Sequence, residues 1–376
     1  MPTGPTVTID LAALRHNLQV LRARLSPGVR LMAAVKADAY GLGVARIARE
    51  LEHSGADAFG VATAEEALAL RAAAVTGPVL VMGPVRERVA ELVDAAVDLT
   101  VTDAECLASI ERASPSARAR VHVKVDTGMG RLGHPAEDAL DLVRAVERSR
   151  SCEFAALWTH LACADEADAD DPRGLTALQL ERFEQALEAL RAAGVEAPAS
   201  HAANSAATLR LPRAHRDLVR PGLALYGHHA TPAAEALMPA EVPALRPIAT
   251  LRAPVVFVKR VPRGASISYG ATWRAPRDTV IATVRLGYAD GYPRAAGNVA
   301  QASLNGELVE VVGRVCMDQS MLDLGPRADV AVGDVATFYG PGGPSLAVLA
   351  EKLGTVSYEL LTNLQALRLA REYVEG

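Results

Sequence analysis

Two kinds of segment alternate along the first two thirds of the chain. Short runs rich in Val, Leu and Ala precede longer segments, such as 176–194, whose apolar residues recur at helical spacing between charged ones. Eight such runs occur, at 29–36, 57–62, 78–83, 97–102, 120–126, 154–160, 198–204 and 217–227. Eight β-α units predict an α/β fold, a (β/α)8 TIM barrel over residues 1–240, with catalytic groups at the C-terminal ends of its strands.

The pattern changes after about residue 230. Prolines become frequent, and the runs that follow are rich in Val and Ile and are separated by Gly, Asn and Pro turns. This pattern predicts a mostly β C-terminal domain over residues 241–376, with a hairpin turn at Asn305-Gly306. Apolar residues at helical spacing over 358–373 predict a terminal helix that closes this domain.

Composition narrows the classes of function. The 376 residues carry a net charge of -5 without a Lys/Arg-rich run, which argues against a nucleic-acid partner. Four cysteines without a C-x-x-C pair indicate reduced thiols and no structural metal. The start of the chain lacks a signal-peptide pattern, and no apolar stretch is long enough to cross a membrane. We therefore expect a cytoplasmic protein without a membrane partner.

Lysine is rare here, with four in the whole chain, and one of them ends the first apolar run. A barrel would point Lys36 into its mouth, where loss of water lowers the proton affinity of the amine and favours a Schiff base with a carbonyl. A surface lysine at a strand end is the plain alternative. Tyr40, Gly41 and Gly43 follow closely and suit a tight loop against a ligand.

Two segments at the ends of the seventh and eighth runs suit an anion. Asn204 and Ser205 stand at a predicted strand-to-helix junction, where free N–H groups attract negative charge, although Ser205 could simply be an N-cap. Within the eighth run, Arg220 and Gly222 end the predicted strand, and barrels often bind phosphate at the loops after strands seven and eight.

Strand-end residues elsewhere allow two interpretations. Arg131 lies in a glycine-flanked loop after Lys124 and offers a bidentate fork for a carboxylate, but a loop arginine usually pairs with a neighbouring acid. His160 and His201 end or occupy the sixth and seventh runs, and lone strand histidines are more often hydrogen-bonding residues than ligands. In the β domain, polar and aromatic residues occupy glycine-rich turns that would pass for ordinary hairpins, namely Tyr269, Tyr288, Met317 and Asp318.

Taken together, these segments resemble the alanine racemase family, which binds pyridoxal 5'-phosphate in its type III fold. The resemblance covers nearly the whole chain. The matching motifs occur in the family's order and are VKADAYG, DTGMGRLG, THLACADE, HAANSAATL, RPGLALYG, SYGATW, LGYADGYPR, CMDQ and SYE.

The resemblance implies a role for each matching residue. Lys36 and Tyr269 would be the two catalytic bases, and Lys36 would also hold the cofactor covalently. Further cofactor-binding residues would be Tyr40, His160, Asn204, Ser205, Arg220 with His201 behind it, Gly222, Leu223 and Tyr358. Substrate would contact Arg131, Met317, Tyr288 and Asp318, and Lys124 would be carbamylated. No metal is implied.

The same resemblance implies interconversion of L-alanine and D-alanine, with D-alanine supplied for peptidoglycan precursors. A symmetric pair of bases suits this reaction because a proton must leave Cα on one face and return on the other. The family's head-to-tail homodimer would bring Tyr269 from a partner subunit into a shared active site.

Three other classes remain open on the residues alone. A metal-dependent amidohydrolase barrel could use Lys124, His160 and His201, but no H-x-H motif ends the first run. A pyridoxal-phosphate-binding homeostasis protein usually consists of the barrel alone. Amino-acid decarboxylases of the same fold group also add a β domain, but they run longer and lack this set of motifs.

Overall fold

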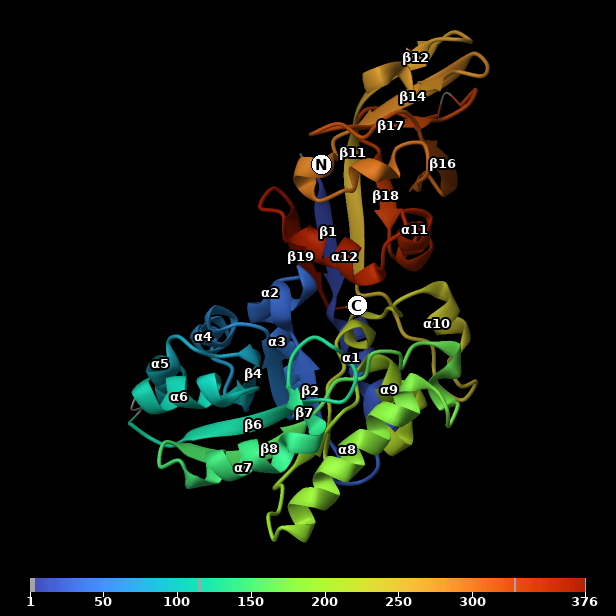
Figure 1. The fold of residues 1–376 in the computed structure, drawn as a ribbon. Coiled ribbons are helices and arrows are strands. Elements are labelled where there is room, and N and C mark those ends of the chain that lie inside the picture. The colour runs from blue at the N-terminus through green and yellow to red at the C-terminus, as the bar shows by residue number, and fades with distance from the viewer. Residues whose placement is uncertain (1–3, 114–115, 328, 376) are drawn as a thin grey trace.

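The computed structural model describes residues 4–113, 116–327 and 329–375. Two lobes are stacked end to end, a barrel with helices around it and a β-rich lobe above it (Figure 1). Eight parallel strands form the barrel in the order β10, β2, β3, β4, β5, β6, β8, β9. Their bounds are β2 Arg30–Ala34, β3 Ala58–Val61, β4 Val79–Pro84, β5 Val97–Val101, β6 Ala119–Asp126, β8 Cys152–Trp158, β9 Ser200–His201 and β10 Leu218–Val219.

Each barrel strand overlaps one of the eight apolar runs, and the predicted TIM barrel is confirmed. The ring closes between β9 and β10, where the Asp217 amide donates to the Ser200 carbonyl and the Arg220 amide donates to the Ala203 carbonyl. Helices cover the outside, and the apolar stripe of each packs on the strands. They are α3 Val44–His53, α4 Ala64–Ala72, α5 Val89–Asp94, α6 Ala104–Ala113, α7 Ala139–Arg148, α8 Leu175–Ala192 and α9 Ser205–Arg210.

The second lobe is mostly β, as predicted. Its sheet runs in the order β14, β17, β16, β15, β18, β11, β1, β19, and an additional β14–β11 pairing closes the first six strands into a ring. The strands are β11 Ala249–Val261, β14 Thr279–Val284, β15 Gln301–Leu304, β16 Glu307–Val311, β17 Ser320–Asp323, β18 Val335–Tyr339, β1 Thr6–Asp10 and β19 Ala370–Val374. The hairpin at Asn305-Gly306 joins β15 to β16, and both turn residues have positive φ.

Two expectations about this lobe were wrong. The N-terminal residues do not belong to the barrel, because β1 pairs antiparallel with β11 and parallel with β19. The predicted terminal helix over 358–373 is broken: α12 ends at Thr362, one 3-10 turn follows over Asn363–Gln365, and β19 completes the chain. Backbone pairing with β1 therefore overrides the local helical spacing.

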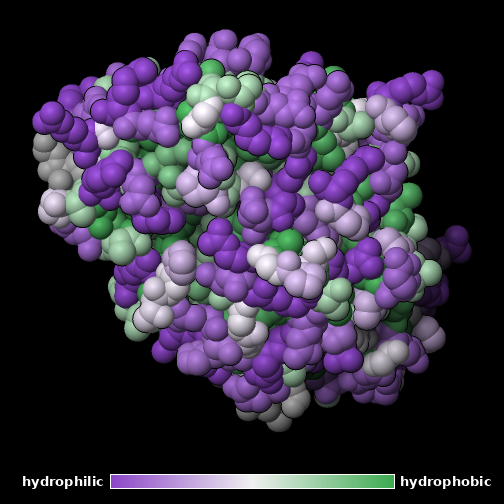
Figure 2. Space-filling model, turned by 90° about the horizontal axis from the view of Figure 1, so that it is seen from below, coloured by the Kyte–Doolittle hydropathy of each residue, from purple (hydrophilic) through white to green (hydrophobic). Residues whose placement is uncertain are grey.

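Buried contacts join the lobes. Helix α1 (Leu11–Ala23) leads from β1 to the barrel, and its fully buried Asn17 donates to the carbonyls of Leu225 and Arg246 and accepts from the Arg246 amide. One buried amide thus ties the end of the barrel to the segment that enters β11. Seen from below, the barrel end of the molecule is covered mostly by polar residues with apolar ones scattered among them (Figure 2).

Candidate active site

A cavity of about 490 Å³ opens at the C-terminal ends of the barrel strands. Ten of the residues that the sequence singled out line it, together with residues that it did not. The lining consists of Ala34, Lys36, Tyr40, Ala62, Met82, Gly83, Lys124, Leu132, Arg131, Trp158, His160, Asn204, Ser205, Arg220, Gly222 and Tyr358. Leu223 is buried beside them and lines an adjoining smaller cavity with Asn204 and Tyr358.

Lys36 begins an unusual backbone segment directly after β2. The four residues Ala37 to Tyr40 all have φ between 53° and 58°, so α2 (Lys36–Tyr40) makes a left-handed turn. Such a conformation costs L-residues about 1–2 kcal/mol each, so the surroundings must hold it in place. The Glu66 carboxylate does so by accepting from the amides of Ala37 and Ala62, at 2.7 Å each. Asp38 accepts from the Val44 amide at 2.8 Å.

Both lysines of the cavity are poor cations. Burial first, and then the charge of Arg131, lowers the pKa of Lys36, while Glu66 opposes the shift. Burial and the charges of Arg131 and Arg220 lower the pKa of Lys124 to about 8. Lys124 therefore has a substantial neutral fraction at pH 8, which makes its amine nucleophilic. The barrel presents two lysines with lowered pKa values in one cavity.

The loop that carries Arg131 is fixed by Asp126 at the end of β6. Its carboxylate accepts from the amides of Gly128, Met129 and Gly130 at 2.9, 2.9 and 3.2 Å. Burial opposes ionisation, but these donors lower the pKa of Asp126 below its ordinary value. Gly133 ends the loop, where a Cβ would stand 2.6 Å from the Asp126 amide nitrogen. The backbone of the loop is thus fixed, and Arg131 is exposed at the edge of the cavity.

Ser205 and Gly222 form a compact polar corner of the cavity. Asn204, not Ser205, caps α9, because its side chain accepts from the Ala207 amide. The Ser205 hydroxyl instead accepts from the amides of Gly222, at 2.9 Å, and Ala224, at 3.3 Å. A Cβ on Gly222 would stand 2.3 Å from the Tyr40 hydroxyl, so only glycine fits there.

Two tyrosine rings complete this corner. The rings of Tyr40 and Tyr358 are 6.0 Å apart, although Tyr358 comes from α12 (Ser357–Thr362) in the second lobe. Burial raises the pKa of Tyr358 to about 12, and it also raises the pKa of Tyr40, so both are neutral hydroxyl donors. Hydroxyl and amide groups gathered in this way suit a phosphate.

Arg220 occupies the floor of the cavity and is 4 % exposed. Its guanidinium donates to His201 Nδ1 at 2.7 Å and to the carbonyls of Thr159 and Ala202 at 2.8 and 3.0 Å. His160 Nδ1 lies 3.4 Å away. Burial lowers the pKa of Arg220 to about 9, which leaves it a cation at neutral pH. It therefore offers a fixed positive donor beneath whatever the cavity binds.

Apart from Tyr358, the candidate residues of the second lobe do not line this cavity. Tyr269 is 72 % exposed and lies beside β12 (Ser266–Ile267), which Figure 1 places at the end of the molecule remote from the barrel. Met317 is 54 % exposed, and Tyr288 is bound to the same turn through its amide and the Cys316 carbonyl. Asp318 is paired with Arg368 at 2.6 Å. These residues form a second, exposed group of their own.

Residues that the sequence did not single out also shape the site. Trp158 lies between Lys124, 4.7 Å from its ring, and Arg220, 4.8 Å from it. Glu66 holds the turn after Lys36, as described above. Trp158 lies in the sixth apolar run, at the end of β8, and could have been found there, whereas Glu66 looks like an ordinary surface helix residue in the sequence.

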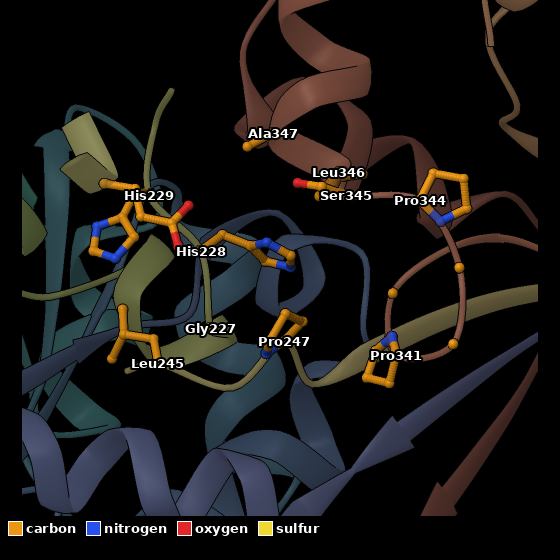
Figure 3. A pocket seen from close by; sticks show the side chains of 14 residues that line it. Gly227, His228, His229, Leu245, Pro247, Pro341, Pro344, Ser345, Leu346 and Ala347 are labelled. Carbon is orange, nitrogen blue, oxygen red and sulfur yellow. The ribbon is translucent and has the colours of Figure 1, made fainter. Parts of the chain in front are cut away.

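Another cavity, of about 320 Å³, lies where the two lobes meet (Figure 3). The imidazoles of His228 and His229 and the rings of Pro247, Pro341 and Pro344 surround it. Burial lowers the pKa of His228 to about 4, so this histidine is neutral. The cavity shares His228 and His229 with the small space next to Ser205 but does not include Lys36.

Among the described residues, no group of three His, Cys, Asp or Glu side chains is placed to hold a metal ion. No described helix is both long enough and apolar enough to span a membrane.

A (β/α)8 barrel with a desolvated lysine at its mouth, joined to a β lobe, defines a lysine-dependent barrel enzyme. Family models for the N-terminal and C-terminal domains of alanine racemase match residues 9–230 and 248–373. The chain therefore belongs to the alanine racemase family.

Individual relatives agree. Alanine racemase from Chlorobaculum tepidum is 40% identical over 96% of this chain and 94% of its own, and that from Corynebacterium efficiens is 41% identical over 98% of each. Among solved structures, alanine racemase from Streptomyces lavendulae superposes with a TM-score of 0.92 at 38% identity, covering 100% of this chain and 98% of that one. The enzyme from Streptomyces coelicolor gives 0.91 at 39%, covering 99% and 98%.

Proposed function

We propose that the chain interconverts L-alanine and D-alanine with bound pyridoxal 5'-phosphate, using Lys36 and Tyr269 as its two bases. The observation that carries this proposal is the placement of Lys36. Its amine has a lowered pKa, lies in a cavity with the buried Arg220, and is presented by a backbone turn that the protein stabilises at a cost.

The cavity residues fit the cofactor. The corner formed by Ser205, Gly222, Tyr40 and Tyr358 offers neutral donors to a phosphate and excludes a Cβ. Arg220 would face the pyridine nitrogen, and His160 would pack against the ring. When bound, pyridoxal phosphate supplies an electron sink that acidifies the Cα–H bond of the amino acid. Because Arg220 remains protonated, it donates a hydrogen bond without transferring its proton, which limits how strongly the ring withdraws electrons.

The remaining chemistry is proton transfer by this chain's residues. The Lys36 amine takes the proton from one face of Cα or returns it there, and the Tyr269 phenol acts on the opposite face. Arg131 and the Met317 backbone hold the substrate carboxylate, and Tyr288 and Asp318 border the entrance. Carbamylation of Lys124 would replace a cation near Arg131 by an anion that accepts hydrogen bonds from it.

Tyr269 must come from another copy of the chain. It lies on an exposed face of the second lobe and does not line the cavity that holds Lys36. A head-to-tail homodimer would bring the two groups together in each of two shared sites. We propose that this dimer works in the cytoplasm and supplies D-alanine for peptidoglycan precursors.

Incubation of cofactor-loaded protein with L-alanine in deuterated water tests the proposal. D-alanine should accumulate with deuterium at Cα. Lys36→Ala should abolish both signals and the visible absorbance of lysine-bound cofactor, and Lys352→Ala, a matched change at an exposed lysine, should leave them intact. Absorbance without D-alanine would contradict the reaction, and normal turnover by Lys36→Ala would contradict the assigned base.

A further inference from the structure

A row of buried polar side chains continues from Arg220 away from the cavity. Arg220 Nη1 lies 2.7 Å from His201 Nδ1, and His201 Nε2 lies 2.9 Å from His122 Nδ1. His122 Nε2 in turn lies 3.2 Å from the Asp98 carboxylate. The other oxygen of that carboxylate accepts from Arg120 on the surface at 3.3 Å. The row therefore links the floor of the cavity to the outside of the barrel through β9, β6 and β5.

The chemistry of the two ends fixes the direction of every hydrogen bond between them. An arginine can only donate, so His201 Nδ1 must accept and the proton of this ring sits on Nε2. His201 Nε2 then donates to His122 Nδ1, which leaves the His122 proton on Nε2, facing Asp98. A carboxylate can only accept, so Asp98 accepts from His122 Nε2 and every hydrogen bond in the row has one donor and one acceptor. Both histidines must be neutral, and each has a single allowed tautomer.

Packing keeps the first histidine in this orientation. His201 is completely buried, and its ring stacks on Trp158 at a centroid distance of 5.4 Å and an angle of 16°. The Arg220 guanidinium lies over the same indole. Burial, and then the charge of Arg220, lowers the pKa of His201 well below its ordinary value, in agreement with a neutral ring. A flipped His201 would turn a C–H toward Arg220, and a protonated His201 would turn an N–H toward it, so either change would remove the acceptor of Arg220.

We propose that His122 and Asp98 are positioning residues for the racemisation reaction, which fix the tautomer of His201 and through it the orientation of the Arg220 guanidinium. This inference rests on the proposed function for its effect on turnover. Neither residue touches the cavity, so both act only through His201. The tautomers themselves follow from this chain's own contacts.

The first test needs no variant. Protein labelled with ¹⁵N at histidine and loaded with cofactor is examined at pH 7.5 by long-range ¹⁵N–¹H correlation, which separates the two neutral tautomers from the imidazolium form. We expect His201 and His122 to be neutral with the proton on Nε2. A proton on Nδ1 of either ring, or an imidazolium at either, would overturn the proposal. This readout does not depend on alanine being the substrate.

The second test compares two substitutions of His122. Asn can place its carbonyl oxygen where Nδ1 stands and accept from His201, whereas Leu fills a similar volume without an acceptor. His122→Leu should lower kcat about tenfold with KM changed less than about threefold, and it should release the His201 tautomer in the ¹⁵N spectrum. His122→Asn should keep kcat within about threefold of the parent protein.

His215 provides a matched control, because it is also buried and hydrogen-bonded but lies outside the row. His215→Asn should leave the spectrum of His201 unchanged. Equal kcat values for His122→Leu and the parent protein, or an unchanged His201 tautomer in that variant, would overturn the proposal. If His122→Leu fails to fold, Asp98→Ala replaces it. This variant removes the acceptor of His122 at the outer end of the row and is judged by the same kcat and ¹⁵N readouts. Correct tautomers in a protein that does not racemise alanine would count against the proposed function alone.

Discussion

The barrel cavity and the exposed face of the second lobe hold the two groups of candidate residues in very different states. In the cavity, Arg220 and Lys124 are buried to 4 % and 1 % exposure, and burial shifts the pKa of each. On the second lobe, Tyr269 and Met317 are more than half exposed. With the proposed roles, a single chain preorganises one half of the site and leaves the other half in water. The proposal therefore requires that something cover the exposed half.

The largest expected effect tests whether that cover is a second copy of the chain. Lys36→Ala and Tyr269→Phe should each lower activity by more than about a thousandfold. Heterodimers of these two variants, isolated with two affinity tags, should recover about half of the parent activity per dimer, because one of their two shared sites is intact.

The matched control places both substitutions in one chain and pairs it with an unaltered chain. Shared sites predict that this heterodimer is inactive, because each site then carries one substitution. Sites built within one chain predict the reverse for both heterodimers. The two arrangements contain the same substitutions in the same number, so only their distribution can separate them.

A smaller effect concerns the burial of Lys124. Its pKa is about 8 in the folded protein and 10.5 in its ordinary state, so between these pH values the unfolded chain binds more protons. The free energy of unfolding should therefore rise with pH over this range, by at most about 3 kcal/mol. Below pH 8 Lys124 is protonated in the folded protein too, so the full free-energy cost of burying its charge lowers the stability. Denaturant unfolding of cofactor-free protein in carbon-dioxide-depleted buffer measures the slope.

Lys124→Met should lack this contribution, so the difference between the two proteins isolates it. Bicarbonate should also remove it from the parent protein and should raise the mass by one carboxyl group, if Lys124 becomes carbamylated. An identical slope in the parent and in Lys124→Met would show that this lysine is not desolvated as its surroundings indicate.

Gly222→Ala should weaken cofactor binding about tenfold to a hundredfold, because overpacking of a tight site costs about 1–3 kcal/mol. The added Cβ would stand 2.3 Å from the Tyr40 hydroxyl. Fluorescence titration with pyridoxal phosphate measures the affinity. Adding Tyr40→Phe to Gly222→Ala should restore part of the loss, and strictly additive losses in the double variant would refute the contact.

The smallest effect lies in the scaffold of the second lobe. Asn305 has φ 52° in the hairpin turn, a conformation that asparagine tolerates better than alanine. Asn305→Ala should destabilise the protein by about 1 kcal/mol, seen as a lower Tm. Its kcat should stay unchanged, and a clear loss of activity would mean that this turn takes part in the site.

The strands of the barrel could be predicted from the sequence because each is a short apolar run followed by a helix of clear period. Prediction from local sequence pattern was wrong at the two ends of the chain, where β1 and β19 belong to the second sheet. Segment 358–373 has helical spacing, yet Leu367 is fully exposed and 370–374 pair with β1. Pairing between residues so far apart leaves no trace in either local pattern.

The residues of the candidate site also fall into those that could be identified from the sequence and those that could not. Lys36, Arg131 and Arg220 could be identified because strand ends converge at a barrel mouth. Glu66 and the His122–Asp98 pair could not, because a surface-helix glutamate and strand residues of ordinary type become informative only once their partners are known. The sequence allowed Ser205 to be either an anion-binding residue or the N-cap of a helix. Its hydroxyl accepts from the Gly222 amide, which decides against the N-cap.

The position of β1 bears on how the chain is made. This strand is synthesised before both of its neighbours, because β11 follows about 240 residues later and β19 about 360 residues later. The barrel can form while β1 has no partner, and the second sheet is complete only after β19 has left the ribosome. A fragment cut near residue 240 would separate β11 from β1, so neither piece would contain a whole sheet of the second lobe.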